Sequence, residues 1–193
     1  MMNSWKLKEI VVMSVLSVVF AVVYLAFLPV GKILVGFFGP LGYDFIFGIW
    51  FIVSIIAAYI IRKPGAAFLS ETIAATVEVL LGNAVGPILM VTGMIQGLGA
   101  ESAFAMTRYK RYDLFTLMLA GMMAAVFSFV WGYFLSGFAA LSTGYVLAMF
   151  IVRIISGALI SGVLGKALSD SLAKTGVLSS FALGKERRKQ RAA

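Results

Sequence analysis

The sequence predicts an all-α integral membrane protein, a bundle of six transmembrane helices with both termini in the cytoplasm. Of its 193 residues, 62% are hydrophobic and 12% are charged, whereas close to a quarter of the residues in a soluble domain are charged. A membrane-spanning helix needs ~20 mostly apolar residues, and the chain has room for about six. Fourteen of the sixteen Lys and Arg residues fall at the N-terminus, in two predicted loops or in the C-terminal segment. The positive-inside rule therefore places both ends in the cytoplasm of a multi-pass protein of the cell membrane.

Each predicted helix begins and ends where an apolar run is interrupted. The first helix follows Lys6 and Lys8, and its length and its Leu-Pro-Val-Gly-Lys ending indicate a retained helix rather than a cleaved signal peptide. Residues 29–42 contain two Pro and four Gly, which predicts a loop that partly dips into the membrane. The predicted helices cover residues 10–28, 43–61, 64–81, 87–107, 114–135 and 145 to 165 or beyond.

The helices form one predicted domain, and a charged segment follows it. Residues 1–175 make up a single six-helix transmembrane domain, and residues 176–193 a basic cytoplasmic tail that we expect to be disordered. The basic character of the tail is explained by topology and by contact with anionic membrane lipid. Binding to nucleic acid is not predicted.

Acidic residues interrupt the third and fourth predicted helices. Glu71, Glu78 and Glu101 occupy positions where a purely structural membrane helix would carry an aliphatic side chain, at a cost of roughly 2.5–3.5 kcal/mol each on insertion scales. Glu71 and Glu78 are seven residues apart and therefore share one face of their helix. We expect this face to point into the bundle or into a wet cavity.

The depth of the polar and aromatic residues predicts a substrate pocket that opens to the outside of the membrane. The predicted lining residues are Glu78, Gln96, Trp131, Trp50, Asn83, Tyr145 and Glu71. Aromatic faces and a carboxylate suit a small, flat, cationic or amine-bearing molecule. An alternative is that Arg153 neutralises Glu71 or Glu78 and that the aromatic residues form an interfacial belt. Glu71 and Glu101 also fit a role in holding the bundle together or in transmitting binding to the cytoplasmic side.

Small residues recur at four-residue spacing in several predicted helices. Gly93 and Gly97 form one such pair, and Gly157 and Ser161 belong to another stripe. Spacing of this kind lets helix backbones approach closely. Packing within a single bundle is the favoured interpretation, and a stripe on the outside of the bundle would instead dock a partner membrane protein.

The composition also excludes several kinds of chemistry. The chain has no Cys and no His, so disulfides, Cys/His metal sites and Cys/His nucleophilic catalysis are ruled out. No catalytic residue, metal site or cofactor is predicted. A Gly-rich phosphate-binding loop with Lys-Ser/Thr is absent from the sequence, so any ATP must be hydrolysed by another chain. Two other classes stay open: an intramembrane enzyme with the three Glu residues as acid–base groups, and a self-sufficient homo-oligomeric exporter or channel.

The run PGAAFLSETIAATVEVLLGN…GP…GMIQGLGAE at 64–101 resembles the YkoE-type S components of energy-coupling factor (ECF) vitamin transporters. The chain length and predicted topology extend the resemblance to essentially the whole chain. The resemblance implies a high-affinity substrate-binding subunit that imports thiamine or its hydroxymethylpyrimidine precursor, with another vitamin such as riboflavin as the alternative. Thiamine is then the transported ligand and not a cofactor, and the chain is not an enzyme.

The resemblance also implies partner proteins. S components work with a transmembrane coupling protein and two ATPase subunits, which reorient them by ATP hydrolysis. In this family the first helix commonly presents an Ala-x-x-x-Ala pair to the coupling protein. The nearest match here is Ser17 and Ala21, which we therefore predict as docking residues.

Overall fold

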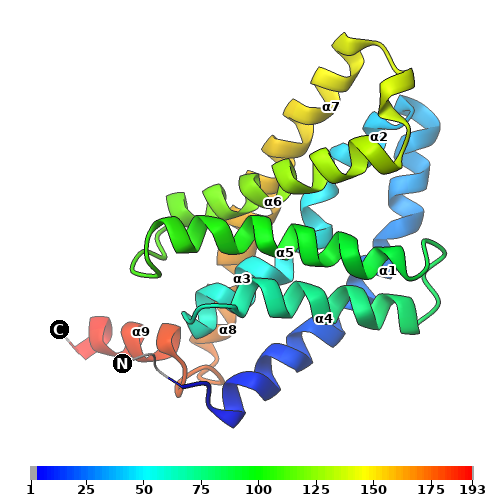
Figure 1. Cartoon of the computed structure of the whole chain (residues 1–193). Helices are drawn as coiled ribbons and strands as arrows, with labels where there is room; N and C mark the ends of the chain where they lie inside the picture. Colours follow the sequence, from blue (N-terminus) through cyan, green and yellow to red (C-terminus); the bar gives the residue numbers. More distant parts are fainter. Residues whose placement is uncertain (1–3, 193) are drawn as a thin grey trace.

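The structure, a computed structural model, describes residues 4–192 and over this range consists of helices joined by short connections (Figure 1). In chain order the elements are α1 (Leu7–Phe38), α2 (Leu41–Asp44), the 3-10 helix η1 (Phe47–Phe51), α3 (Ile52–Ile61), α4 (Ala66–Leu80), α5 (Ile88–Met106), α6 (Leu114–Leu135), the 3-10 helix η2 (Phe138–Ala140), α7 (Thr143–Ser156), the π-helix η3 (Gly157–Leu164), α8 (Gly165–Lys174) and α9 (Ala182–Ala192).

Four helical segments are long and apolar enough to cross a membrane. They are α1, α5, α6 and the continuous segment Thr143–Lys174, which comprises α7, η3 and α8. The segment Phe47–Ile61 is a shorter apolar helix, and α4 has 15 residues. The beginning of α1 and the C-terminal helix α9 lie at the same end of the molecule (Figure 1). The prediction of an all-helical membrane protein is confirmed.

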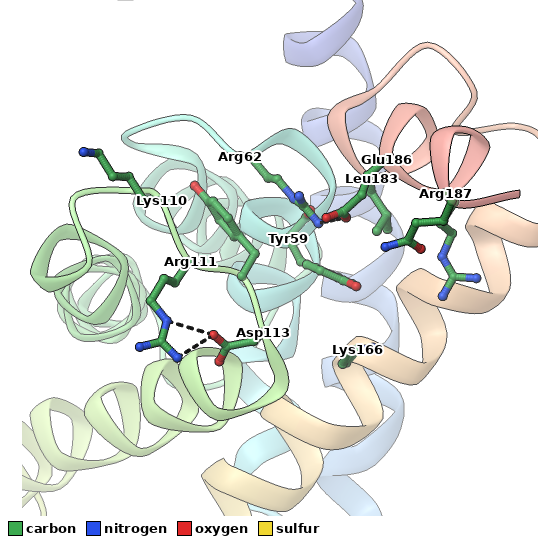
Figure 2. A pocket seen from close by; sticks show the side chains of 11 residues that line it. Tyr59, Arg62, Lys110, Arg111, Asp113, Lys166, Leu183, Glu186 and Arg187 are labelled. Carbon is green, nitrogen blue, oxygen red and sulfur yellow. Dashed lines mark hydrogen bonds and ion pairs between the residues drawn. The ribbon is translucent and has the colours of Figure 1, made fainter. Parts of the chain in front are cut away.

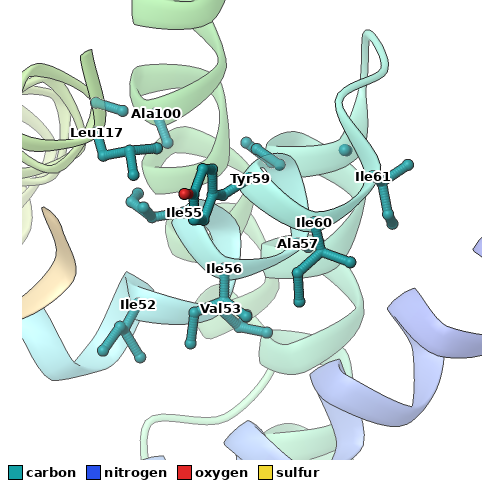
Figure 3. Packing of buried hydrophobic residues seen from close by; sticks show 14 of the residues in the cluster. Ile52, Val53, Ile55, Ile56, Ala57, Tyr59, Ile60, Ile61, Ala100 and Leu117 are labelled. Carbon is teal, nitrogen blue, oxygen red and sulfur yellow. The ribbon is translucent and has the colours of Figure 1, made fainter. Parts of the chain in front are cut away.

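The short helix α3 forms the centre of the bundle. All ten of its residues are buried, and it packs against α1, α4, α6 and α8. Figure 3 shows its isoleucine side chains with Ala100 of α5 and Leu117 of α6 in the same apolar cluster. A helix that is apolar on every side is expected to be surrounded by other elements, and the other helices accordingly assemble around α3.

The first helix is longer than predicted. The prediction of a loop at residues 29–42 is wrong for most of this range, because α1 continues through Pro29 to Phe38. Proline is tolerated inside a membrane helix when local adjustments and neighbouring groups satisfy the freed backbone acceptors. The helix ends at Gly39, whose φ of +62° allows its N–H to donate to Val35 O at 2.8 Å.

The second predicted helix, 43–61, is broken into three pieces. Between α2 and α3 the backbone forms the 3-10 helix η1, which lies against the π-helix η3. The Gly48 N–H donates to Ser156 Oγ at 3.0 Å, and Ser161 Oγ donates to Gly48 O at 2.6 Å. Serine hydroxyls therefore satisfy backbone groups that a regular helix would satisfy internally, which permits irregular backbone inside the bundle.

The C-terminal tail is not the disordered segment that its composition suggested. Residues Ala182–Ala192 form α9, and α9 packs against α3. The tail carries three buried apolar residues, Leu178, Phe181 and Leu183, which attach it to the bundle. Lys8 Nζ donates to Ser180 O at 3.2 Å, so the two ends of the chain are also in contact.

The small-residue stripes pack inside the bundle. A Cβ atom placed on Gly97 would lie 3.0 Å from the backbone of Phe68, so α5 touches the α4 backbone there. Gly121 of α6 meets Gly157 of η3 in the same way. These contacts agree with the interpretation that the stripes serve close packing within one bundle.

Candidate ligand-binding site

Two carboxylates lie buried on one face of α4. The side chains of Glu71 and Glu78 belong to residues that are only 1% and 3% exposed. Tyr24 donates a hydrogen bond to Glu71 Oε2 at 3.3 Å, and Asn83 Nδ2 donates one to Glu78 Oε2 at 2.9 Å. Within residues 4–192, neither carboxylate forms an ion pair with a Lys or Arg side chain. The pair therefore offers two buried acceptors to which no cation of the described chain is bound.

Tyr24 of α1 links the carboxylate face to a group of aromatic rings. Its hydroxyl accepts a hydrogen bond from the Val53 N–H at 3.1 Å while donating to Glu71. Its carbonyl accepts from Trp50 Nε1 at 3.2 Å. Sequence reasoning did not identify Tyr24, although a fully buried tyrosine in the middle of an aliphatic helix needs a hydrogen-bond partner.

The ring of Trp50 continues the aromatic group. Its centroid lies 5.7 Å from that of Tyr43 and 5.8 Å from that of Phe47. Trp50 is partly buried, so it joins the wall of the bundle next to Tyr24. The three rings are tilted toward one another and not stacked. A carboxylate on one side and aromatic rings on the other suit a flat molecule that carries a positive charge or an amino group.

Glu101 of α5 holds the other end of α4. Its Oε1 atom accepts from the Gly65 N–H at 2.6 Å, and its Oε2 atom accepts from the N–H groups of Ala67 and Phe68 at 2.9 and 3.1 Å. The first N–H groups of a helix have no partner within the helix and carry its positive dipole end. Glu101 thus caps α4 from a neighbouring helix, so its negative charge is compensated.

Arg153 pairs with a residue that sequence reasoning did not consider. Its Nε atom lies 2.6 Å from Asp44 Oδ1, and both residues are buried, at 4% and 0% exposure. Its guanidinium carbon lies 3.7 Å from the centre of the Phe47 ring. The alternative interpretation, in which Arg153 neutralises Glu71 or Glu78, is therefore wrong, because α2 packs against α7 and supplies Asp44 as the partner. The sequence did contain a signal for this partner, because Asp44 is the one charged residue in the otherwise apolar stretch 41–52.

Two further predicted pocket residues bond to other helices. Gln96 Nε2 donates to Ser128 Oγ at 3.1 Å, which ties α5 to α6 inside the bundle. Trp131 Nε1 donates to Thr92 Oγ1 at 3.0 Å. The Trp131 ring lines an open apolar groove on α5 and α6, and the lining of this groove includes neither Glu71 nor Glu78.

Tyr145 also lies apart from the carboxylates. Its hydroxyl donates to Phe38 O at 2.6 Å and accepts from the Leu41 N–H at 3.1 Å, so it connects α7 to the junction of α1 and α2. Among the predicted lining residues, the structure joins Glu78 to Asn83, and it connects Glu71 to Trp50 through Tyr24. Gln96, Trp131 and Tyr145 are placed in other contacts, and their part in binding stays a prediction.

The predicted docking pair on α1 faces the inside of the molecule. Ser17 and Ala21 have no exposed surface, and Ser17 Oγ lies 2.8 Å from Ser70 O of α4. In this arrangement the two residues are covered by the bundle, so a partner could reach them only after α1 had moved away. The exposed side chains of α1 include Val11, Val15, Val18, Val19 and Val22.

Comparison with known proteins gives three matches. Residues 8–127 match the model of a family described as ABC-type cobalt transport system, permease component. The chain is 63% identical over 190 residues to the putative HMP/thiamine permease protein YkoE of Bacillus subtilis (strain 168), in an alignment that covers 98% of this chain and 96% of the relative. A solved structure described as the crystal structure of an S-component of ECF transporter is 62% identical, with a TM-score of 0.95 and coverage of 98% of this chain and 96% of that one.

Proposed function

We infer that this chain, which belongs to the YkoE-type S components of energy-coupling factor transporters, captures thiamine or its hydroxymethylpyrimidine precursor at the outer face of the cell membrane. It is a transport subunit and a multi-pass membrane protein. We further propose six membrane crossings with both termini in the cytoplasm. The clustering of Lys and Arg and the position of α9 beside the start of α1 support this orientation.

The observation that carries the proposal is the pair of buried carboxylates without a cation. An uncompensated charge inside a low-dielectric bundle is costly, and a cationic ligand would compensate it. Thiamine carries a positively charged thiazolium and an aminopyrimidine ring. Glu71 and Glu78 would attract the positive charge or accept from the amino group, and the Trp50 face would stack on a ring.

ATP hydrolysis is assigned to partner subunits. The sequence contains no Gly-rich phosphate-binding loop with Lys-Ser/Thr, so we propose that a coupling membrane protein and two ATPases drive transport. The purified chain should then bind vitamin but fail to accumulate it in proteoliposomes. Accumulation by the chain alone, without ATPases, would instead support a self-sufficient transporter.

Tryptophan fluorescence of the purified chain tests the ligand. We expect saturable quenching by thiamine, with hydroxymethylpyrimidine and riboflavin as comparison ligands, at sub-micromolar to low-micromolar concentration. The Trp50→Phe variant should lose most of the signal. The matched Trp5→Phe variant should keep it, because Trp5 lies beside Lys63 at the end of the molecule that carries the termini. Quenching by riboflavin alone would identify riboflavin as the ligand in place of thiamine. No response to any of the three compounds would contradict the proposal.

A further inference from the structure

A polar cavity of about 410 Å³ lies at the end of the molecule that carries the termini, between the 107–113 loop and α9. Five basic side chains line it: Arg62, Lys110, Arg111, Lys166 and Arg187. Figure 2 shows that they come from segments far apart in the sequence and that the Lys110 side chain extends away from the others. The volume falls in the range of sites that hold small ligands.

The positive charge of this cavity exceeds what its carboxylates compensate. Arg111 pairs with Asp113 at 2.9 Å, and Arg62 pairs with Glu186 at 2.6 Å. Asp170 has to serve two cations, since it lies 2.6 Å from Lys166 and 2.8 Å from Arg187. In the part of the chain that the structure describes, Lys110 forms no ion pair. The cavity is therefore suited to an anion.

Arg62 is a lining residue of the cavity that is held in place by its neighbours. It follows α3 with a left-handed backbone (φ +56°), and its Nε–H donates to Tyr59 O at 3.2 Å. Its guanidinium lies 5.3 Å from the centre of the Tyr59 ring and 5.0 Å from that of Tyr112. A fixed guanidinium recognises phosphate oxygens at a lower entropic cost than a mobile side chain does.

Exposed apolar side chains lie directly beside the basic ones. Leu114 and Phe115 follow Asp113 at the start of α6, and Val163 and Leu164 precede Lys166 at the end of η3. We expect lipid headgroups to meet acyl chains at the level of this change from apolar to basic side chains. A ligand bound here can therefore place a phosphate in the cavity and hydrocarbon along α6 and η3.

We propose that this cavity binds the phosphate group of an anionic phospholipid. Basic pockets at the cytoplasmic side of membrane helices are suited to such headgroups. The proposal requires only that the basic end of the molecule lies at a membrane surface, and it holds whichever vitamin is transported. A free phosphate ion offers the same chemistry, and an acidic segment of a partner protein is the competing occupant.

Lipid binding to the purified full chain tests the proposal. We would measure the affinity for phosphatidylglycerol and phosphatidylcholine by native mass spectrometry, and thermal stabilisation by the same lipids and by inorganic phosphate. We expect a preference for phosphatidylglycerol that falls about tenfold in the double variant Lys110→Gln, Arg187→Gln. The control is Lys174→Gln, Lys189→Gln, which removes the same charge from residues outside the cavity lining and should keep the preference.

The outcomes separate the alternatives. An equal loss of the phosphatidylglycerol preference in both double variants would show a general electrostatic attraction to the protein surface. This result would contradict a specific site in the cavity. A third outcome is that inorganic phosphate stabilises the wild type, that the cavity double variant loses this effect, and that no lipid is preferred. This result would show that the cavity binds free phosphate and would contradict the phospholipid proposal. No preference for lipid, combined with impaired assembly of the variant with its partner subunits, would assign the cavity to an acidic protein segment. If the double variant fails to fold, Lys110→Gln alone serves, because this exposed side chain forms no ion pair in the described chain.

Discussion

Two pairs of buried ionisable residues in this protein, Arg153 with Asp44 and Glu71 with Glu78, differ in whether an opposite charge lies beside them. Arg153 and Asp44 form an ion pair at 2.6 Å, and the guanidinium lies over the Phe47 ring. Glu71 and Glu78 are just as buried, but their hydrogen-bond donors are the neutral side chains of Tyr24 and Asn83. Burial is common to both groups, so it does not separate them.

The presence or absence of a compensating charge is the difference that matters. A buried pair has its charge satisfied within the chain and can fix one helix against another. A buried carboxylate without a cation keeps its capacity to attract one from outside. We therefore expect the first group to respond to mutation through stability and the second through ligand binding.

The largest effect should come from breaking the compensated pair. Asp44→Ala leaves Arg153 buried without its partner, and we expect a loss of about 3–5 kcal/mol in the free energy of unfolding, measured by denaturant titration in detergent. The double variant Asp44→Leu, Arg153→Met removes both charges and should recover most of the loss. A cost no larger than that of an exposed substitution would show that the pair does not stabilise the fold.

Glu101 extends the comparison to a carboxylate compensated by backbone. Glu101→Ala removes the acceptor of three N–H groups at the start of α4, and we expect about 2 kcal/mol of destabilisation in the same denaturant titration. Glu101→Gln keeps one acceptor oxygen and should fall between the alanine variant and the wild type. The dissociation constant for thiamine should not change in either protein, and a large change would place Glu101 in the binding site.

Glu78 represents the uncompensated group. Glu78→Gln keeps an oxygen that can accept from Asn83, so the melting temperature should be unchanged or raised. The dissociation constant for thiamine should increase about tenfold, which corresponds to about 1.4 kcal/mol. Hydroxymethylpyrimidine has no fixed positive charge and is the matched control, because its affinity should fall less. An unchanged thiamine affinity would assign Glu78 to the structure.

The smallest effect concerns an exposed and compensated charge. Asp113 Oδ1 accepts from the Thr116 N–H at 2.9 Å at the start of α6, and this bond together with Arg111 holds the pKa of the carboxyl below its usual value of 3.8. Asp113→Ala should cost about 1 kcal/mol at neutral pH.

The pH dependence of this contribution has a definite sign. A carboxyl with a lowered folded-state pKa stabilises the fold above its unfolded pKa, and the contribution is lost as the pH falls through the folded pKa. The stability difference between wild type and Asp113→Asn, which keeps a capping oxygen, should therefore be constant from about pH 5 to about pH 7 and shrink below about pH 4. A difference that grows on acidification would contradict this assignment.

The fold was predictable to different degrees along the chain. Regular apolar runs such as those of α5 and α6 indicated their helices within a few residues, because hydrophobicity over ~20 residues is a local property. Pro29 was a misleading signal, since α1 continues through it. The break at Gly48 depends on Ser156 and Ser161, more than a hundred residues away, and no local pattern contains that information.

Composition and charge placement by themselves determined that this is a helical membrane protein without Cys or His chemistry, and the pattern at 64–101 indicated its family. Only the tertiary structure decided which charges are compensated. Asp44 meets Arg153, Glu101 caps α4, and Glu71 and Glu78 are left with neutral donors. The physical reason is that hydropathy and helical spacing act within one helix, whereas charge compensation depends on which helices pack together.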